Sequence, residues 1–269
     1  NIIIDLTHRD TVINSGLTFV NDREIQGFRR SCNWAKDQHV YFFARFSRPF
    51  NDFGIAVDDN IVSRKALEGR EGKRIKAFVS FRTHAQEPIT VRVGISAVSI
   101  EGARKNLEAE TAEKTFNQVR SEAQVQWAGV LDKIKVRGGT PGQNRTFYTA
   151  LYHQYLNPNL YMDVDRRYRG RDMKIHTAGD FDNYTLFSLW DTYRTTHPLF
   201  TILEPQRTNH FIRTFITQYR QGGLLPVWEL SANETYCMIG YHSIPVIADA
   251  YIKGIRGYDA GAALEAMIH

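Results

Sequence analysis

Two stretches of the sequence place a tryptophan next to a carboxylate, at residues 189–198 (LWDTYRTTHP) and at residues 221–230 (QGGLLPVWEL). A sugar offers an apolar face that packs on an aromatic ring, and hydroxyls that hydrogen-bond to a carboxylate. A Trp–Asp pair can also be a core anchor at the start of a helix. Because two such pairs lie close in sequence with polar residues between them, we favour a carbohydrate-binding site.

The polar residues around the two tryptophans supply the candidate contacts. Asp191 and Arg194 have the spacing of one helix face, so Arg194 could keep Asp191 ionised as a hydroxyl acceptor or form an ordinary ion pair with it. Glu229 and Glu234 could bind a sugar, act as a general acid against an apolar wall, or accept hydrogen bonds within a loop. The candidate sugar-binding residues are Trp190, Asp191, Arg194, Glu229, Glu234 and His242.

Other kinds of chemistry find little support. Asp163 and Asp165 could suggest calcium, but their loop lacks the glycine and terminal glutamate of an EF-hand. Asp249 lies in an apolar helix, where a carboxylate needs a partner, so we expect a structural role. Nucleophile elbow, phosphate loop and dinucleotide motifs are missing from the sequence. Three histidines lack the spacing of a metal site: His39, His84 and His153.

Length and composition fit a globular protein of two domains or of one large domain. The 269 residues are 42% hydrophobic and 12% aromatic, with a net charge of +5 and a pI near 9.1. Basic residues alternate with acidic ones instead of clustering, which argues against a nucleic-acid partner. The sequence contains no apolar run long enough for a transmembrane helix. Cys32 and Cys237 are too few for a disulfide framework or a zinc site.

Hydrophobic periodicity divides the chain into a β part and a helical part. Alternating patterns at 75–81 and 89–95, with apolar runs at 2–4, 17–20 and 40–46, predict an antiparallel β-sandwich over residues 1–100. We expect residues 101–138 to be a helical linker, with one long amphipathic helix to residue 131 and a short strand at 133–136.

From residue 139 to 269 we expect helix hairpins arranged around a centre. Thr140 begins a helix as a capping box with proline at its first position, and Gly222-Gly223 ends another. A helix over 190–203 should be interrupted or bent near Pro198. The chain opens within a strand pattern and stops within a helical run, which suggests an internal piece of a longer protein.

Several motifs taken together are similar to one enzyme family. In the β part these are GFRRS (27–31) and FSRPF (46–50). In the helical part they are residues 189–198, 222–229, 233–235 (NET), 238–243 (MIGYHS) and 245–251. The sequence resembles glycoside hydrolase family 92, the calcium-dependent exo-acting α-mannosidases. The resemblance implies a β-sandwich, a helical linker and an (α/α)6 catalytic toroid, of which this chain would hold the C-terminal portion of the first and the first part of the last.

The resemblance also implies an inverting release of terminal mannose from α-mannosides, with α-1,2 linkages the expected substrate. One carboxyl group would protonate the leaving oxygen while another, roughly 6.5–9.5 Å away, activates water. The family carries these groups in GNEP and GNDD motifs, and neither string occurs here. We therefore expect the catalytic acid and base, and most calcium ligands, beyond His269. Asn233-Glu234 matches only part of the GNEP motif, and we do not assign Glu234 as the catalytic acid.

Two alternatives remain at this point. Another toroid exo-glycosidase, such as a glucosidase or trehalase-like enzyme, would use a Trp–Asp pair without calcium. A non-catalytic carbohydrate-binding protein could keep the fold and lack the downstream carboxylates. The resemblance further implies a periplasmic or extracellular location, an α-mannoside glycan as partner, and an isolated chain that is inactive and prone to aggregate.

Overall fold

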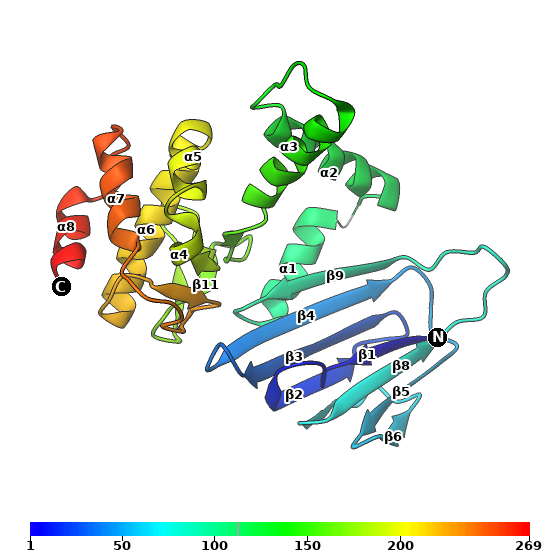
Figure 1. Cartoon of the computed structure of the whole chain (residues 1–269). Coiled ribbons are helices and arrows are strands. Elements are labelled where there is room, and N and C mark those ends of the chain that lie inside the picture. Colours follow the sequence, from blue (N-terminus) through cyan, green and yellow to red (C-terminus); the bar gives the residue numbers. More distant parts are fainter. Residues whose placement is uncertain (112) are drawn as a thin grey trace. The chain divides into compact units, whose positions relative to one another are not determined.

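The computed structural model describes residues 1–111 and 113–269, which form two compact units (Figure 1). The first unit spans residues 1–113 together with residues 162–168, and the second spans residues 114–161 and 169–269. Antiparallel sheets dominate the first unit and helices the second, as expected from the two kinds of periodicity. Among the described residues, no helix has both the length and the apolarity needed to cross a bilayer.

The first unit packs two antiparallel sheets face to face. One has the strand order β1-β8-β5-β6 and the other β7-β2-β3-β4-β9. Their inner faces share a core that includes Leu17, Phe19, Ile25, Ile55 and Val79. The bounds are β1 Ile2–Asp5, β2 Thr11–Phe19, β3 Glu24–Cys32, β4 Gln38–Phe46, β5 Asp52–Val57, β6 Asn60–Arg64, β7 Arg70–Gly72, β8 Ile75–Ser80 and β9 Val91–Ser96.

Helix α1 (Ile100–Thr111) covers the outer face of the larger sheet, where Ala103 and Leu107 pack on Phe43. Gly94 in β9 permits this approach, because a Cβ there would lie 2.0 Å from the carbonyl oxygen of Ala103. The buried carboxylate of Asp163 then accepts hydrogen bonds from Ser96 Oγ (2.7 Å) and from the Asn106 side chain (2.9 Å). Asp163 therefore ties its loop to β9 and α1, and this use leaves little capacity for a cation.

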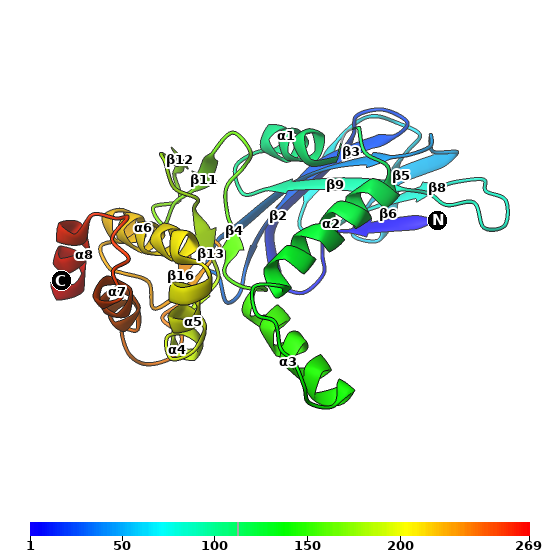
Figure 2. The same cartoon turned by 90° about the horizontal axis from the view of Figure 1, so that it is seen from above.

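The second unit is organised around a helical core formed by α5, α6, α7 and α8, which Figure 2 views from above. Phe200, Phe211, Phe215 and Val246 are among its buried residues. The helices are α2 Phe116–Leu131, α3 Pro141–Gln154, α4 Leu189–Thr192, α5 Thr196–Leu203, α6 Pro205–Gly222, α7 Ser243–Ile252 and α8 Ala260–Ile268. The short strands of the remaining chain are β10 Asn159–Leu160, β11 Arg167–Arg169, β12 Ile175–Thr177, β13 Tyr184–Thr185, β14 Phe187–Ser188, β15 Trp228–Leu230 and β16 Asn233–Glu234, and the first two residues of β11 belong to the first unit.

The linker prediction is wrong in detail. The single helix expected over residues 101–131 is two helices, because Thr115 starts α2 with a capping box. Its hydroxyl accepts the Gln118 N–H at 3.3 Å, and Gln118 Oε1 accepts the Thr115 N–H at 2.8 Å. The strand expected at 133–136 is turn and irregular structure.

Helices of the second unit begin and end largely where capping and glycine motifs predict. The capping box at Thr140 starts α3, and Gly223, with a φ of +82°, ends α6. The helix expected over residues 190–203 is interrupted, but the break lies at residues 193–195, between α4 and α5 and before Pro198. Pro198 lies in the first turn of α5, where a backbone N–H has no partner within the helix and its loss costs little. Asp249 has the partner its helix requires, with Lys253 Nζ at 2.7 Å.

Candidate active site

A small antiparallel sheet brings the two tryptophan motifs together. Strand β14 pairs with β15 so that Ser188 lies opposite Trp228 and Phe187 opposite Glu229. Phe187 and Leu189 are buried in the helical core and anchor the first motif from within. The single turn α4 follows, closed by the hydrogen bond from the Tyr193 N–H to the Leu189 carbonyl at 3.0 Å. Strand pairing therefore places the two motifs side by side.

Aromatic and cationic side chains gather at the start of α7. The His242 ring lies 5.1 Å from the Trp190 ring, edge to face, and 4.2 Å from the Tyr193 ring. The Arg194 guanidinium lies over the same two rings, 5.3 Å from the Trp190 centroid and 5.0 Å from that of Tyr193. We call Trp190, Tyr193, Arg194 and His242 the aromatic cluster. Sequence reasoning brought three of them forward, and it left out Tyr193 although this residue stands inside the first motif.

The pairing expected between Asp191 and Arg194 is wrong. Asp191 accepts a hydrogen bond from Ser188 Oγ, and the Arg194 guanidinium stacks on rings. The spacing of three residues predicts an ion pair only within a continuous helix, and α4 ends at Thr192, which places Arg194 in the turn beyond it. Asp191 is exposed and Trp190 half-buried, so both remain accessible to a ligand.

A small pocket of about 150 Å³ adjoins the Ser188 end of this motif. Ser188, Thr192 and Thr196 line one side of it, and His153 with Gln154 lines another. Thr196 Oγ1 donates to Gln154 Oε1 at 2.5 Å, so part of the lining is already paired. The pocket places hydroxyl and amide groups next to Asp191, a composition suited to a polar ligand.

The second tryptophan pair is buried. Glu229 is fully buried and accepts hydrogen bonds from Thr185 Oγ1 (2.9 Å) and from the Ala232 N–H (2.6 Å). Burial raises the pKa of Glu229 to about 7, because removal from water disfavours the charged carboxylate. These bonds support the β15–β16 turn, where Ser231 and Ala232 both have positive φ angles of 49° and 68°. Glu229 therefore supports the loop, and its direct contact with a sugar stays a prediction.

Glu234 supports the same loop from its other end. Its carboxylate accepts hydrogen bonds from the backbone N–H groups of Val227 (2.9 Å), Trp228 (2.9 Å) and Tyr236 (3.0 Å). The buried Arg171 guanidinium lies 4.0 Å from Glu234 Oε2 and donates to the Leu224 carbonyl at 2.6 Å. A carboxylate that binds three backbone donors holds the backbone path of residues 227–236. Sugar binding by Glu234 likewise stays a prediction.

Comparison with known families identifies the whole chain. Residues 1–96 match the N-terminal domain of glycosyl hydrolase family 92, and residues 102–269 match its catalytic domain. The chain belongs to glycosyl hydrolase family 92. The sequence resemblance is thereby confirmed, and with it the fold class of antiparallel β-sheets followed by helices that match this family's structures.

Solved family 92 structures share the fold closely. An α-mannosidase from Bacteroides thetaiotaomicron is 36% identical, with a TM-score of 0.94 over 99% of this chain and 37% of its own. A family 92 inverting mannosidase from the same organism is 31% identical, with a TM-score of 0.89 over 99% of this chain and 36% of its own. A secreted glycosidase of Arthroderma benhamiae, described as uncharacterized, is 25% identical over 71% of this chain. The chain thus spans little more than a third of the solved relatives, and 21% of the curated one.

The described residues show no cluster of side chains typical of a metal site. Within residues 1–111 and 113–269, no three His, Cys, Asp or Glu side chains gather around a position that could hold a metal ion. Asp163 is occupied by Ser96 and Asn106, and Asp165 by Lys105 and Arg167. The carboxylates of this loop are therefore already paired within the family 92 chain.

Proposed function

We propose that the protein to which this chain belongs is an exo-acting α-mannosidase that releases terminal mannose from α-mannosides, with α-1,2 linkages preferred. The observation that carries the proposal is the 36% identity to an α-mannosidase over 99% of the chain, across both family domains. A structure of that relative in complex with mannoimidazole supports a mannose-like ligand.

This chain would contribute part of the sugar subsite. Trp190 offers an aromatic surface to the apolar face of a mannose ring, and Asp191 offers carboxylate oxygens to its hydroxyls. The Arg194 guanidinium lies over the Trp190 and Tyr193 rings, and the His242 ring contacts both, which preorganises the platform. Glu229 and Glu234 fix the adjoining loop from beneath.

We further propose an inverting mechanism assisted by calcium, with the acid, the base and most metal ligands outside this chain. A relative described as an inverting mannosidase supports the stereochemistry. The calcium rests on the family resemblance alone. Export to the periplasm or the cell exterior is supported by the curated relative, whose description calls it secreted.

Hydrolysis of α-1,2-mannobiose by the full-length protein tests the substrate and the metal together. We expect activity that a calcium chelator abolishes and added calcium restores. Activity that is indifferent to chelation would favour another toroid glycosidase. A protein that binds mannosides without cleaving them would favour the non-catalytic alternative.

A further inference from the structure

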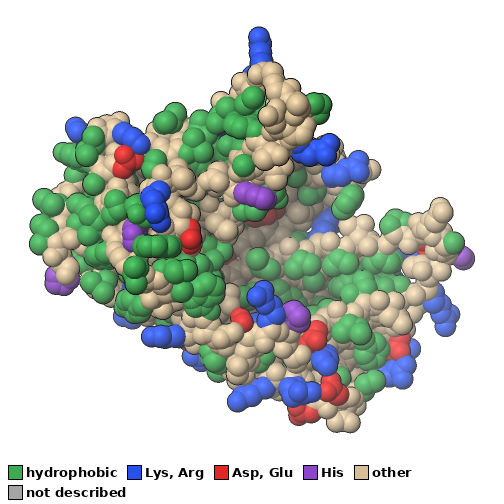
Figure 3. Space-filling view, viewed as in Figure 1, with side chains coloured by type: hydrophobic (Ala, Val, Ile, Leu, Met, Phe, Trp, Pro, Cys, Tyr) green, Lys and Arg blue, Asp and Glu red, His purple; other side chains and the backbone are tan. Residues whose placement is uncertain are grey.

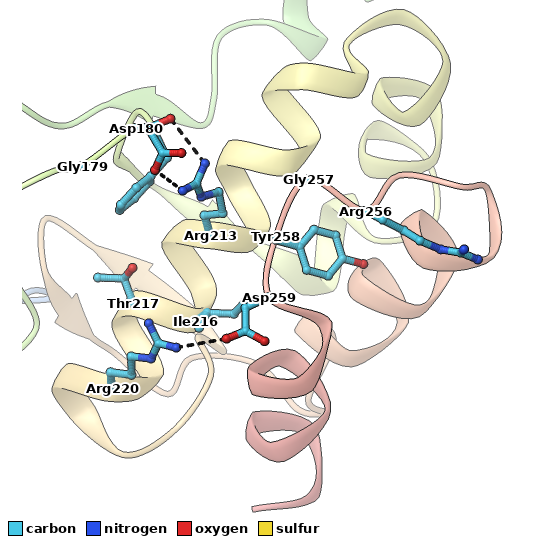
Figure 4. Close-up of a pocket in the computed structure, with 11 residues that line it drawn as sticks. Gly179, Asp180, Arg213, Ile216, Thr217, Arg220, Arg256, Gly257, Tyr258 and Asp259 are labelled. Carbon is cyan, nitrogen blue, oxygen red and sulfur yellow. Dashed lines mark hydrogen bonds and ion pairs between the residues drawn. The ribbon is translucent and has the colours of Figure 1, made fainter.

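A second pocket lies within the helical unit and shares no residue with the predicted sugar contacts. It has a volume of about 440 Å³ and is bordered by α6, by residues 179–181 and by residues 256–259 before α8 (Figure 4). Arg213, Thr217 and Arg220 line it from one face of α6, at spacings of four and three residues. Because a helix rises about 1.5 Å per residue, the two arginines are separated by about 10 Å along the axis.

Each of these arginines forms an ion pair with an aspartate that also lines the pocket. Arg213 is hydrogen-bonded to the Asp180 carboxylate and, at 3.3 Å, to the Asp180 carbonyl. Arg220 Nη2 lies 3.6 Å from Asp259 Oδ2, too far for a hydrogen bond. Figure 4 shows these two pairs on either side of Thr217. The pocket therefore carries a donor and an acceptor at each end and a hydroxyl between them.

The charges that face the pocket cancel. Two guanidinium groups balance two carboxylates, and the third arginine, Arg256, points away in Figure 4, with its guanidinium 4.3 Å from the Tyr251 ring. An anion or a cation would meet a like charge at either end. A sugar hydroxyl both donates and accepts, so a neutral chain of hydroxyls suits paired donors and acceptors.

The polar groups are solvated and keep capacity for a ligand. Side-chain exposure is 82% for Asp180, 61% for Arg220 and 62% for Asp259. Asp259 uses Oδ1 to cap α8, through the Ala262 N–H at 3.0 Å, and leaves Oδ2 towards the pocket. The volume falls in the range of small-molecule sites.

We propose that this pocket is an additional binding site for a neutral oligosaccharide, recognised by Asp180, Arg213, Thr217, Arg220 and Asp259. Only the identity of the sugar as mannose rests on the proposed function. The site would hold a glycan chain on the protein without touching the bond that is cleaved. It therefore supplies affinity for long substrates and leaves the hydrolysis of a disaccharide unaffected.

Binding of α-1,2-mannotetraose to the full-length protein tests this site when the first sugar site is filled with mannoimidazole. We expect residual binding that Arg220→Ala weakens about tenfold, the size of one lost hydrogen bond to a charged group. Asp259→Asn keeps the cap of α8 and removes the carboxylate, and it should also weaken binding. Arg145→Ala, which removes an exposed arginine of α3, is the matched control and should bind as the wild type does.

The site would be overturned if the tetraose did not bind in the presence of mannoimidazole, or if Arg220→Ala bound the tetraose as tightly as the wild type does. It would also be overturned if the protein bound inorganic phosphate in place of the tetraose, and if Asp259→Asn tightened that phosphate binding. The last pattern would mark an anion site. Hydrolysis of α-1,2-mannobiose separates the two proposals. If the wild type cleaves it but lacks the second binding event, only this inference fails. If the wild type does not cleave it, the proposed function fails.

Discussion

Trp190 and Trp228 look alike in the sequence and differ in the structure. Trp190 is half-buried, with Asp191 exposed beside it, whereas Trp228 is buried and Glu229 fully so. The difference follows from position, because Trp228 and Glu229 lie in the central strand of the β14-β15-β16 sheet. An exposed pair can meet a ligand, and a buried pair must be satisfied by its own chain, as Glu229 is by Thr185 and Ala232.

Replacement of Trp190 tests the platform. We expect Trp190→Ala to lower kcat/KM for α-1,2-mannobiose about tenfold or more, because a large aromatic contact to the sugar is lost. Trp34→Ala, at a tryptophan of the first unit that is 52% exposed, is the control and should have wild-type kinetics. Unchanged kcat/KM in Trp190→Ala would remove Trp190 from the sugar subsite.

Glu229 should make stability depend on pH. Its pKa is about 7 when folded against an ordinary value of 4.5, so the folded state keeps a proton that the unfolded state releases. This stabilisation is fully present below pH 4.5 and is lost as the pH rises through 7, by about 3 kcal/mol in total. Glu229→Gln should flatten the decline of the thermal midpoint between about pH 4.5 and 7.5. Glu110→Gln, at an exposed site, is the control and should leave this decline unchanged. If the thermal midpoint fell equally with pH in the wild type and in both variants, Glu229 would not be the group responsible.

Residue types brought forward three members of the aromatic cluster, and their binding of a sugar stays a prediction. Trp190, Arg194 and His242 were chosen as separate sugar contacts, yet in the structure both Arg194 and His242 contact the rings of Trp190 and Tyr193. Ring stacking between α4 and α7 depends on how distant segments pack, which no local spacing encodes. For Glu229, the sequence left acceptance of hydrogen bonds within a loop as one of three possible roles, and the structure shows these bonds. It did not predict the turn that they support, since Ser231-Ala232 lacks the Asn-Gly signal of a turn with two positive φ angles.

At the scale of elements, capping and termination motifs correctly predicted where helices begin and end. Capping at Thr140 and termination at Gly223 were both placed correctly, because a cap depends on neighbours in sequence. Periodicity was less reliable: it merged α1 and α2 into one helix, since an amphipathic pattern can continue across a break. It also missed β3 and β5, where glycines and polar residues interrupt the alternation.

Two glycines should respond in opposite directions to alanine. Gly223 has a φ of +82° and open space around its Cα, so Gly223→Ala should destabilise the protein by about 1 kcal/mol through backbone strain alone. Gly129 lies inside α2 without a positive φ, and an added Cβ would meet open space, so Gly129→Ala should stabilise the protein by up to about 1 kcal/mol. The thermal midpoints of the two variants measure both effects. Shifts of the same sign would contradict the different backbone requirements assigned to Gly223 and Gly129.

At the scale of the whole molecule, the helical unit exposes apolar side chains. Tyr251 and Ile252 at the end of α7 are 43% and 81% exposed, and Leu264 and Ile268 of α8 are 55% and 77% exposed. Figure 3 shows hydrophobic side chains gathered on this part of the surface. Apolar surface of this kind is typical of an interface, and the rest of the polypeptide is the simplest partner because the chain spans 37% of a solved relative.

The isolated chain should therefore associate. We expect residues 1–269 made alone to elute as aggregates in size-exclusion chromatography and to show no mannosidase activity. Ile252→Asp with Ile268→Asp should reduce the aggregated fraction, because charge opposes apolar association. A monomeric, active chain would contradict both the exposed interface and the placement of the catalytic carboxylates elsewhere.

The most direct test of the central claim is an NMR time course of α-1,2-mannotriose treated with the full-length protein. An exo-acting, inverting α-mannosidase must release single mannose units, with the β-anomer appearing before mutarotation and mannobiose as the remaining product. We predict this order of signals. Release of α-mannose first would contradict inversion, and an intact trisaccharide would contradict the assignment of the protein as a mannosidase.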